Sequence, residues 1–365
     1  MKIKCQTSQL HTAFQLAGSV VQQRPTRPIL ADVLLSAEGG RLELGATDLE
    51  ISVRLEVQGA EVLEEGRIAV PQARMASILR ETTDESIEIR SEEGSCVLTA
   101  SDSEFRLPTE VADEFPELPA FEEEKAYDFD RKDFVEMVTR TSFAAHKGKH
   151  RYALNGVLVV IKPNKVEMVA TDGRRLAHIE KKCKNRGEAD EAVIVPTKAL
   201  EEIIKSLTDG EEKIRLNVSE TQLVAKTQRA TVATRLVEGH FPPYESVIPK
   251  DHDKKVDLNR ERFHSAVRRA ALLTSQDSSS VMLSFAKDVL EVRSSAPEMG
   301  EARVKLPVEY SAAEVEVSFN PEFLTDFLRV LEDETVRMEF RDSASAGLLR
   351  AGKDFLYVVM PVSRE

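Results

Sequence analysis

The stretch that decides the fold is LELGATD, residues Leu42–Asp48, because it recurs as VEMVATD, residues Val166–Asp172. Both copies begin with an apolar residue, a glutamate and an apolar residue and end in Ala-Thr-Asp, and a fainter third copy spans Leu290–Ala296. Successive copies are 124 residues apart, and prolines at positions 71, 196 and 321 recur every 125 residues. A solenoid repeat is only about 20–50 residues long, so each copy is predicted to be a whole domain.

Each copy shows the same order of helix and strand patterns. An amphipathic helix is predicted over residues 9–20, 131–143 and 260–273, and alternating strands follow it. The repeated proline is predicted to open a second helix at its first position, where a missing N–H is harmless. Three more alternating strands close each copy, at residues 86–90, 96–100 and 104–107; 213–218, 222–227 and 230–236; and 335–340, 347–350 and 355–360. The expected fold class is α+β, with two helices packed on mostly antiparallel sheet in each of three domains, residues 1–124, 125–249 and 250–365.

The composition favours a soluble globular protein. Of the 365 residues, 41% are hydrophobic and 31% are charged, which is richer in apolar residues than a disordered chain. No apolar run approaches the roughly 18 residues of a membrane span, and the N-terminal segment lacks the apolar core of a signal peptide. Cys5, Cys96 and Cys183 have neither disulfide-framework nor zinc-site spacing. We therefore expect a cytoplasmic protein with no cofactor, no metal and no membrane partner.

The net charge of −13 is unevenly distributed. Residues 1–124 carry −13, residues 125–249 carry +4 and residues 250–365 carry −4. Basic residues recur on the predicted helices and the loops after them in all three repeats. Phosphate contacts need such point charges and no base-specific side chain, and the absence of Trp disfavours binding by base stacking. The predicted duplex-DNA contacts are Arg24, Arg74, Arg80, Lys147, Lys149, Arg151, Tyr152 and Lys198.

No common catalytic motif is present, since the chain has no GxxxxGK[ST], GxGxxG, HExxH or GxSxG. Asp48 and Asp172 are the best candidates for metal-bound carboxylates of a nuclease, but both fit Asx-turns equally well. Their occurrence at equivalent places in two repeats, with Ala296 in the third, favours the turns. His146 and His150 have the i, i+4 spacing of a metal pair, although HKGKH is more typical of a basic loop.

Five stretches together carry a resemblance to a known family. They are RPTRPIL at residues 24–30, GATDLE at 45–50, VATDGRRLA at 169–177, GHFPPYESVIP at 239–249 and YVVMPV at 357–362. In this order and spacing they resemble the β subunit of bacterial DNA polymerase III, the β sliding clamp, over essentially the whole chain. The resemblance implies a head-to-tail homodimer that forms a ring of six domains around duplex DNA. It also implies a non-catalytic function, which is to tether the replicative polymerase and so confer processivity.

The family also has a hydrophobic groove for short motifs of polymerases, the clamp loader and repair proteins. The matching positions here are Leu154, Thr171, Gly173, Arg174, Leu176, Pro242, Val247, Val358, Val359, Met360, Pro361 and Val362. Many relatives carry His in place of Arg174, and Ser246 and Phe323 stand where others carry Arg and Tyr. For the dimer interface we expect Ile78, Leu79, Phe105, Leu272 and Leu273. Two rival functions are a metal-dependent nuclease that uses Asp48 and Asp172, and a protein scaffold that binds no nucleic acid.

Overall fold

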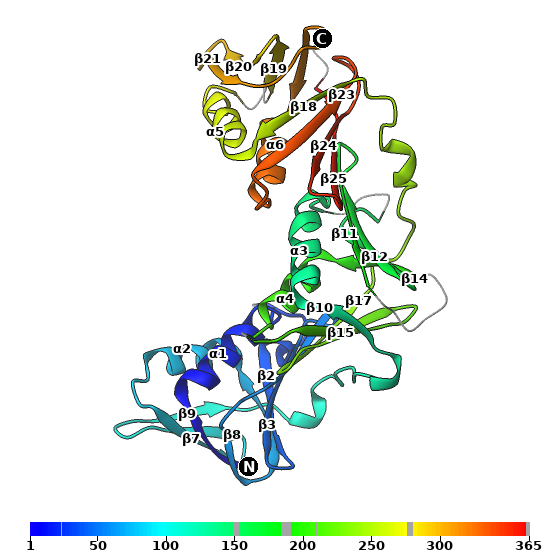
Figure 1. The fold of residues 1–365 in the computed structure, drawn as a ribbon. Helices are drawn as coiled ribbons and strands as arrows, with labels where there is room; N and C mark the ends of the chain where they lie inside the picture. Colours follow the sequence, from blue (N-terminus) through cyan, green and yellow to red (C-terminus); the bar gives the residue numbers. More distant parts are fainter. Residues whose placement is uncertain (23, 149–152, 184–190, 209, 276–279, 363–365) are drawn as a thin grey trace. The chain divides into compact units, whose positions relative to one another are not determined.

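The protein is described by a computed structural model that covers residues 1–365 except 23, 149–152, 184–190, 209, 276–279 and 363–365. The chain forms two compact units. Unit 1 contains residues Met1–Phe134 and Lys198–Leu236, and unit 2 contains Val135–Thr197 and Val237–Glu365. Within the described residues the elements follow one order three times: strand, helix, several strands, helix, three strands (Figure 1). The predicted α+β repeat is confirmed.

The elements have the following bounds. The first repeat contains β1 (Lys2–Gln6), α1 (Thr7–Gly18), β2 (Asp32–Glu38), β3 (Arg41–Thr47), β4 (Ile51–Glu56), β5 (Glu61–Glu64), β6 (Gly66–Pro71), α2 (Gln72–Glu81), β7 (Ser86–Glu92), β8 (Ser95–Thr99) and β9 (Glu104–Pro108). The second contains β10 (Tyr127–Asp130), α3 (Arg131–Thr141), β11 (Gly156–Lys162), β12 (Lys165–Thr171), β13 (Arg175–Lys182), β14 (Glu191–Pro196), α4 (Thr197–Lys205), β15 (Lys213–Val218), β16 (Gln222–Lys226) and β17 (Ala230–Arg235). The third contains β18 (Lys254–Asn259), α5 (Arg260–Ala271), β19 (Val281–Ala286), β20 (Val289–Ala296), β21 (Gly300–Pro307), β22 (Val315–Phe319), α6 (Pro321–Arg329), β23 (Thr335–Phe340), β24 (Gly347–Ala351) and β25 (Phe355–Val359).

Every strand pair described is antiparallel, and two of the pairs join different repeats. In unit 1 an eight-stranded sheet has the order β10-β15-β16-β17-β4-β3-β2-β6, so β17 of the second repeat pairs with β4 of the first. In unit 2 the order β14-β11-β12-β13-β25-β24-β23-β18 likewise pairs β13 with β25. The two remaining sheets, β5-β1-β7-β8-β9 and β21-β20-β19-β22, end on β9 and β21. Each of these end strands therefore has one free edge within the described residues.

The helices bury one apolar stripe each, as their spacing predicts. Leu10 and Phe14 of α1 are fully buried, as is Met75 of α2, and α1 packs against α2. Phe263 of α5 and Phe327 of α6 are equally buried in the third repeat, where these two helices also pack together. Burying an apolar side chain of this size is worth roughly 1.5–3 kcal/mol. Packing of these apolar stripes in the core therefore stabilises the helices, which are too short to be stable in isolation.

The predicted position of the repeated proline is wrong in two copies. Pro71 and Pro196 are the last residues of the edge strands β6 and β14, opposite Asp32 and Gly156, and the helices start one residue later. Proline is tolerated at a sheet edge because its missing N–H can face away from the ladder. Only Pro321 opens its helix, and there the Oδ1 of Asn320 accepts from the N–H of Glu322 at 2.8 Å.

Candidate functional site

The neighbouring ends of β13 and β25 bring most of the predicted groove residues together. Arg175 lies opposite Val359, Leu176 lies opposite Val358, and the N–H of Met360 donates to the carbonyl of Arg174 at 2.9 Å. Beyond the strand, the N–H of Val362 donates to the carbonyl of Ser318 at 2.8 Å. Residues almost 190 positions apart in the sequence therefore form one continuous surface.

The turn before β13 is held by an Asx-turn. The Asp172 carboxylate accepts hydrogen bonds from the N–H groups of Arg174 and Arg175, at 2.9 and 3.1 Å, and Gly173 has a φ of +88°. Asp48 of the first repeat accepts in the same way from Glu50 and Ile51, at 3.0 and 2.7 Å. The Asx-turn interpretation of the two aspartates is confirmed. Moreover, no group of three or more described His, Cys, Asp and Glu residues could hold a metal ion.

Arg175 is a site residue that the sequence analysis missed. Its side chain is 7% exposed and donates to Asp172 at 3.0 Å, to Asp326 at 2.9 Å and to the carbonyl of Phe143 at 2.9 Å. Its guanidinium also lies 4.5 Å from the ring centroid of Phe323. The tandem arginines of ATDGRR were a signal, but Arg174 lies in the exposed turn and Arg175 is the first, buried residue of β13.

A buried cluster lies under this surface. Leu176 and Val358 are 3% exposed and pack with Ala153 and Val169, while Phe241, Tyr244 and Ile248 of the following linker cover the cluster. Leu154 and Val359 are also buried, at 3% and 0%. Arg174 is exposed, and the exposed apolar side chains of the groove are Val247 at 54%, Met360 at 48% and Val362 at 39%. A ligand could reach these three apolar side chains and Arg174 directly.

The linker is fixed to β12 and β13 by a carboxylate. Glu167 is 5% exposed and accepts from the Tyr244 hydroxyl at 3.1 Å, and it lies 2.7 Å from the Lys162 amine and 2.9 Å from the Lys165 amine. A hydrogen bond with His178, at 3.3 Å, is the largest of several contacts that lower the pKa of Glu167. Burial raises the pKa of the Tyr244 phenol, which therefore stays a hydrogen-bond donor.

The predicted DNA contacts are exposed where the structure describes them. Arg24, Arg74 and Lys147 are exposed and form no ion pair with another described residue. Arg80 pairs with Glu81 at 3.1 Å, and Lys198 pairs with Asp48 at 3.2 Å. Lys149, Arg151 and Tyr152 lie outside the described residues, as does His150 of the histidine pair.

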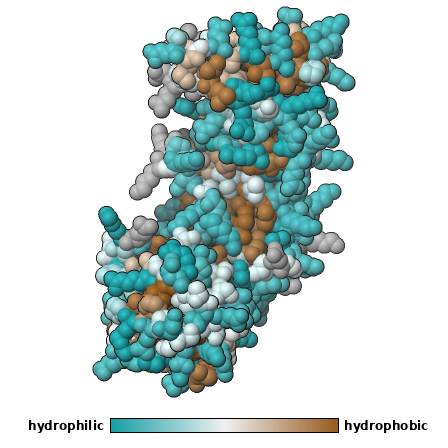
Figure 2. Space-filling view, turned by 90° about the vertical axis from the view of Figure 1, so that its left-hand side faces the viewer, coloured by the Kyte–Doolittle hydropathy of each residue, from teal (hydrophilic) through white to brown (hydrophobic). Residues whose placement is uncertain are grey.

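The predicted interface residues differ in exposure. Leu272 is 72% exposed and Phe105 is 36% exposed, and Ile78 and Leu273 are half-buried. Leu79 is only 2% exposed because it faces the core of its own repeat, so we exclude it from the proposed interface. On the face shown in Figure 2, hydrophobic side chains gather in separate groups on a mostly hydrophilic surface. No helix in the described part of the chain has the length and apolarity that crossing a membrane requires.

Comparison with known proteins identifies the family. The models for the N-terminal, central and C-terminal domains of the DNA polymerase III beta subunit match residues 1–119, 128–243 and 245–363. The chain belongs to the DNA polymerase III beta subunit family. Its function is that of a sliding clamp, and this family is a processivity factor that is not itself catalytic.

Individual members of the beta subunit family are similar over their full length. The Pseudomonas putida beta sliding clamp is 34% identical, and the match covers 99% of this chain and all of that protein. The Escherichia coli beta sliding clamp is 30% identical over the same shares. The crystal structure of the DNA polymerase III subunit beta from Pseudomonas aeruginosa has a TM-score of 0.93 at 32% identity, covering 99% of this chain and 100% of that one. The domain boundaries at 124 and 249 stay a prediction.

Proposed function

We propose that two copies of this chain close head to tail into a ring that encircles duplex DNA. The observation that supports this proposal is how strands of consecutive repeats pair within the chain. At both internal joints, the last strand of one repeat pairs with the strand that follows the Ala-Thr-Asp motif or its equivalent in the preceding repeat. The same rule leaves two unmatched strands, β9 at the end of the first repeat and β21 in the third. Pairing these strands between chains closes the ring and removes both free edges.

The internal joints also supply the register of the proposed interface. Arg175 lies opposite Val359 in one joint, and Ile51 lies opposite Thr234 in the other. Comparing the registers of the matching hairpins shows which residues are equivalent in the three repeats. Gly300 is the equivalent of Ile51 and Arg175. Leu107 is the equivalent of Thr234 and Val359. Leu107 of one chain is therefore predicted to lie opposite Gly300 of the other.

This register places opposite charges across the joint. Moving along the antiparallel pair, Arg106 faces Glu301, Phe105 faces Ala302 and Glu104 faces Arg303. All four charged side chains are more than half exposed in the single chain. Opposite charges on facing positions stabilise a strand pair by roughly 0.2–1 kcal/mol, and like charges destabilise it. Phe105, Leu272, Leu273 and Ile78 would supply the apolar part of the interface.

The ring would bind DNA through phosphate contacts and partners through the groove. A topological hold needs only weak, sequence-independent contacts, which suits the exposed Arg24, Arg74, Arg80, Lys147 and Lys198. The groove at β13 and β25 would take short hydrophobic motifs of the replicative polymerase, the clamp loader and repair proteins. Such a motif would bury two apolar side chains, and ordering the short peptide would offset part of the free energy gained. The expected dissociation constant is therefore roughly micromolar.

Retention on circular DNA tests this function. The protein is loaded by a clamp loader onto a nicked circular plasmid, and bound protein is separated from free protein by gel filtration. We expect the protein to stay on the circle and to be lost after a restriction enzyme linearises the plasmid. Equal retention on both forms would show that the hold is not topological, and cleavage of intact plasmid with Mg²⁺ would favour the nuclease.

A further inference from the structure

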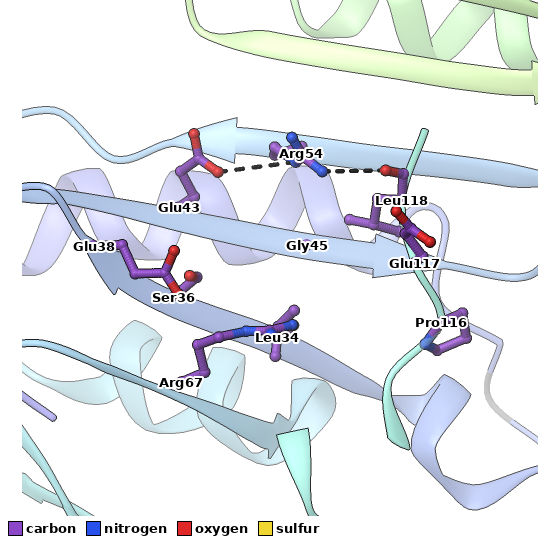
Figure 3. Close-up of a pocket in the computed structure, with 10 residues that line it drawn as sticks. All are labelled: Leu34, Ser36, Glu38, Glu43, Gly45, Arg54, Arg67, Pro116, Glu117 and Leu118. Atoms are coloured by element: carbon purple, nitrogen blue, oxygen red, sulfur yellow. Dashed lines mark hydrogen bonds and ion pairs between the residues drawn. The ribbon is translucent and has the colours of Figure 1, made fainter. Parts of the chain in front are cut away.

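A cavity of about 250 Å³ lies on the sheet of the first repeat (Figure 3). Strands β2, β3, β4 and β6 form its base, and the segment 116–118 crosses one side of it. Leu34, Gly45 and Leu118 supply apolar surface. The carboxylates of Glu38, Glu43 and Glu117 and the guanidinium groups of Arg54 and Arg67 supply the charge. The cavity belongs wholly to unit 1, whereas the proposed groove belongs to unit 2.

In the second repeat, a side chain of the linker fills the place that is equivalent to this cavity. In β3 and β4, Gly45 lies opposite Arg54, and in β12 and β13 the equivalent pair is Val169 and His178. Two residues earlier, Glu43 of the first repeat corresponds to Glu167 of the second. The linkers after the first and second repeats both start with Phe-Pro, at residues 115–116 and 241–242. This correspondence places Leu118 where the second repeat has Tyr244.

In the second repeat, a tyrosine occupies the position. The Tyr244 hydroxyl donates to Glu167 at 3.1 Å, and its ring stacks on His178 with the centroids 5.8 Å apart and the planes at 26°. Lys162, Lys165 and His178 complete the contacts of the carboxylate, at 2.7, 2.9 and 3.3 Å. The carboxylate is sealed from solvent by these groups.

In the first repeat, the equivalent carboxylate is open. Leu118 has no hydroxyl, and Glu38 replaces Lys162, so neither can donate to Glu43. The Nε of Arg54 lies 3.8 Å from Glu43, and the Glu43 side chain is 42% exposed. Arg54 is held beside it by a hydrogen bond to the carbonyl of Leu118 at 3.2 Å, and Arg67 forms no ion pair with a described residue. The Glu43 carboxylate, which can accept a further hydrogen bond, thus lies beside the planar guanidinium of Arg54 and the apolar base of the cavity.

We propose that this cavity binds a tyrosine side chain presented by a partner protein. The phenol donates to Glu43, and the ring lies on the Arg54 guanidinium as Tyr244 lies on His178. Guanidinium groups stack well on aromatic faces, which favours an aromatic ring here. A phenylalanine lacks the donor for Glu43, and a lysine would meet Arg54 and Arg67. This inference does not depend on ring closure or on the groove.

The test titrates N-acetyl-L-tyrosinamide into the full chain labelled at its leucine and valine methyl groups. We expect saturable NMR shifts at Leu34 and Leu118, with a dissociation constant at least fivefold lower than for N-acetyl-L-phenylalaninamide or N-acetyl-L-lysinamide. Glu43→Ala, which changes an exposed side chain, should remove the preference for tyrosine over phenylalanine.

A filling variant provides the second arm of the test. Leu118→Tyr should place its own phenol in the cavity and abolish the shift at Leu34, whereas Leu63→Tyr, at an exposed leucine elsewhere in unit 1, should leave that shift unchanged. The proposal is overturned if phenylalaninamide or lysinamide binds as well as tyrosinamide, if no saturable shift is seen, or if Leu118→Tyr binds like the unmodified chain.

Discussion

At the scale of single residues, the site depends on a few buried polar groups. Arg175 ties the turn at Asp172 to Asp326 and to the carbonyl of Phe143. Removing one partner of a buried, hydrogen-bonded ion pair leaves the others uncompensated. The sequence could identify the Ala-Thr-Asp turn, because the aspartate of an Asx-turn bonds to backbone N–H groups only two or three residues further on. It could not identify Arg175 as buried, because two of its three partners, Asp326 and Phe143, are 151 and 32 positions away.

Arg175→Ala should therefore lower the free energy of unfolding by about 3–5 kcal/mol. The neighbouring Arg174→Ala changes an exposed side chain and should cost no more than about 0.5 kcal/mol. Urea denaturation of both variants measures the difference. Equal losses in the two variants would contradict the assigned function of Arg175.

Glu167 should make part of the stability depend on pH. Its hydrogen bonds, with His178 the largest, lower its pKa in the folded chain. A carboxyl with a depressed pKa stabilises the fold at pH values above its unfolded pKa, about 4.3, and this stabilisation is lost as the pH falls through the folded pKa. Glu167→Gln should thus lose about 3 kcal/mol near pH 7 and less than that at pH 3. A loss that is the same at pH 7 and pH 3 would refute this account.

At the scale of elements, strand and helix positions followed from periodicity alone, but strand partners did not. The closing strands lie within two residues of their predicted bounds, because alternation depends only on neighbouring residues. The pairing of β13 with β25 joins residues from two different repeats, which no local pattern encodes. The groove could therefore be expected only from the family resemblance, and its residues stay a proposal.

Deleting residues Met360–Glu365 tests the groove at this scale. The deletion removes the exposed Met360 and Val362 side chains and the hydrogen bond from Val362 to Ser318, but leaves β25 paired. We expect a folded protein that still dimerises yet binds a polymerase-derived hydrophobic peptide at least tenfold more weakly in fluorescence anisotropy. Unchanged peptide affinity would place the partner site elsewhere.

At the scale of the whole molecule, the threefold repeat is the source of the assembly. Two joints inside the chain use one strand-pairing rule, and the same rule applied between chains gives a closed ring with no free edge left at β9 or β21. The sequence predicted the repeat from LELGATD and VEMVATD. The complementary charges of β9 and β21 became apparent only once the strand register was known.

Leu272→Asp should convert the dimer into folded monomers. Leu272 is 72% exposed in the single chain, and closure of the ring would bury an unpaired charge at that position. Leu63→Asp changes an equally apolar residue that is 47% exposed and should leave the dimer intact. Native mass spectrometry distinguishes the two outcomes, and a dimeric Leu272→Asp would remove Leu272 from the interface.

The most direct test of the account is sedimentation equilibrium on a charge exchange at the proposed joint. The unmodified chain should sediment at twice 40.7 kDa. Arg106→Glu and Glu301→Arg should each weaken the dimer, because each places like charges opposite one another. The double variant, in which each chain carries both changes, should restore the dimer. A monomeric unmodified chain, or a double variant weaker than both single variants, would contradict pairing of β9 with β21.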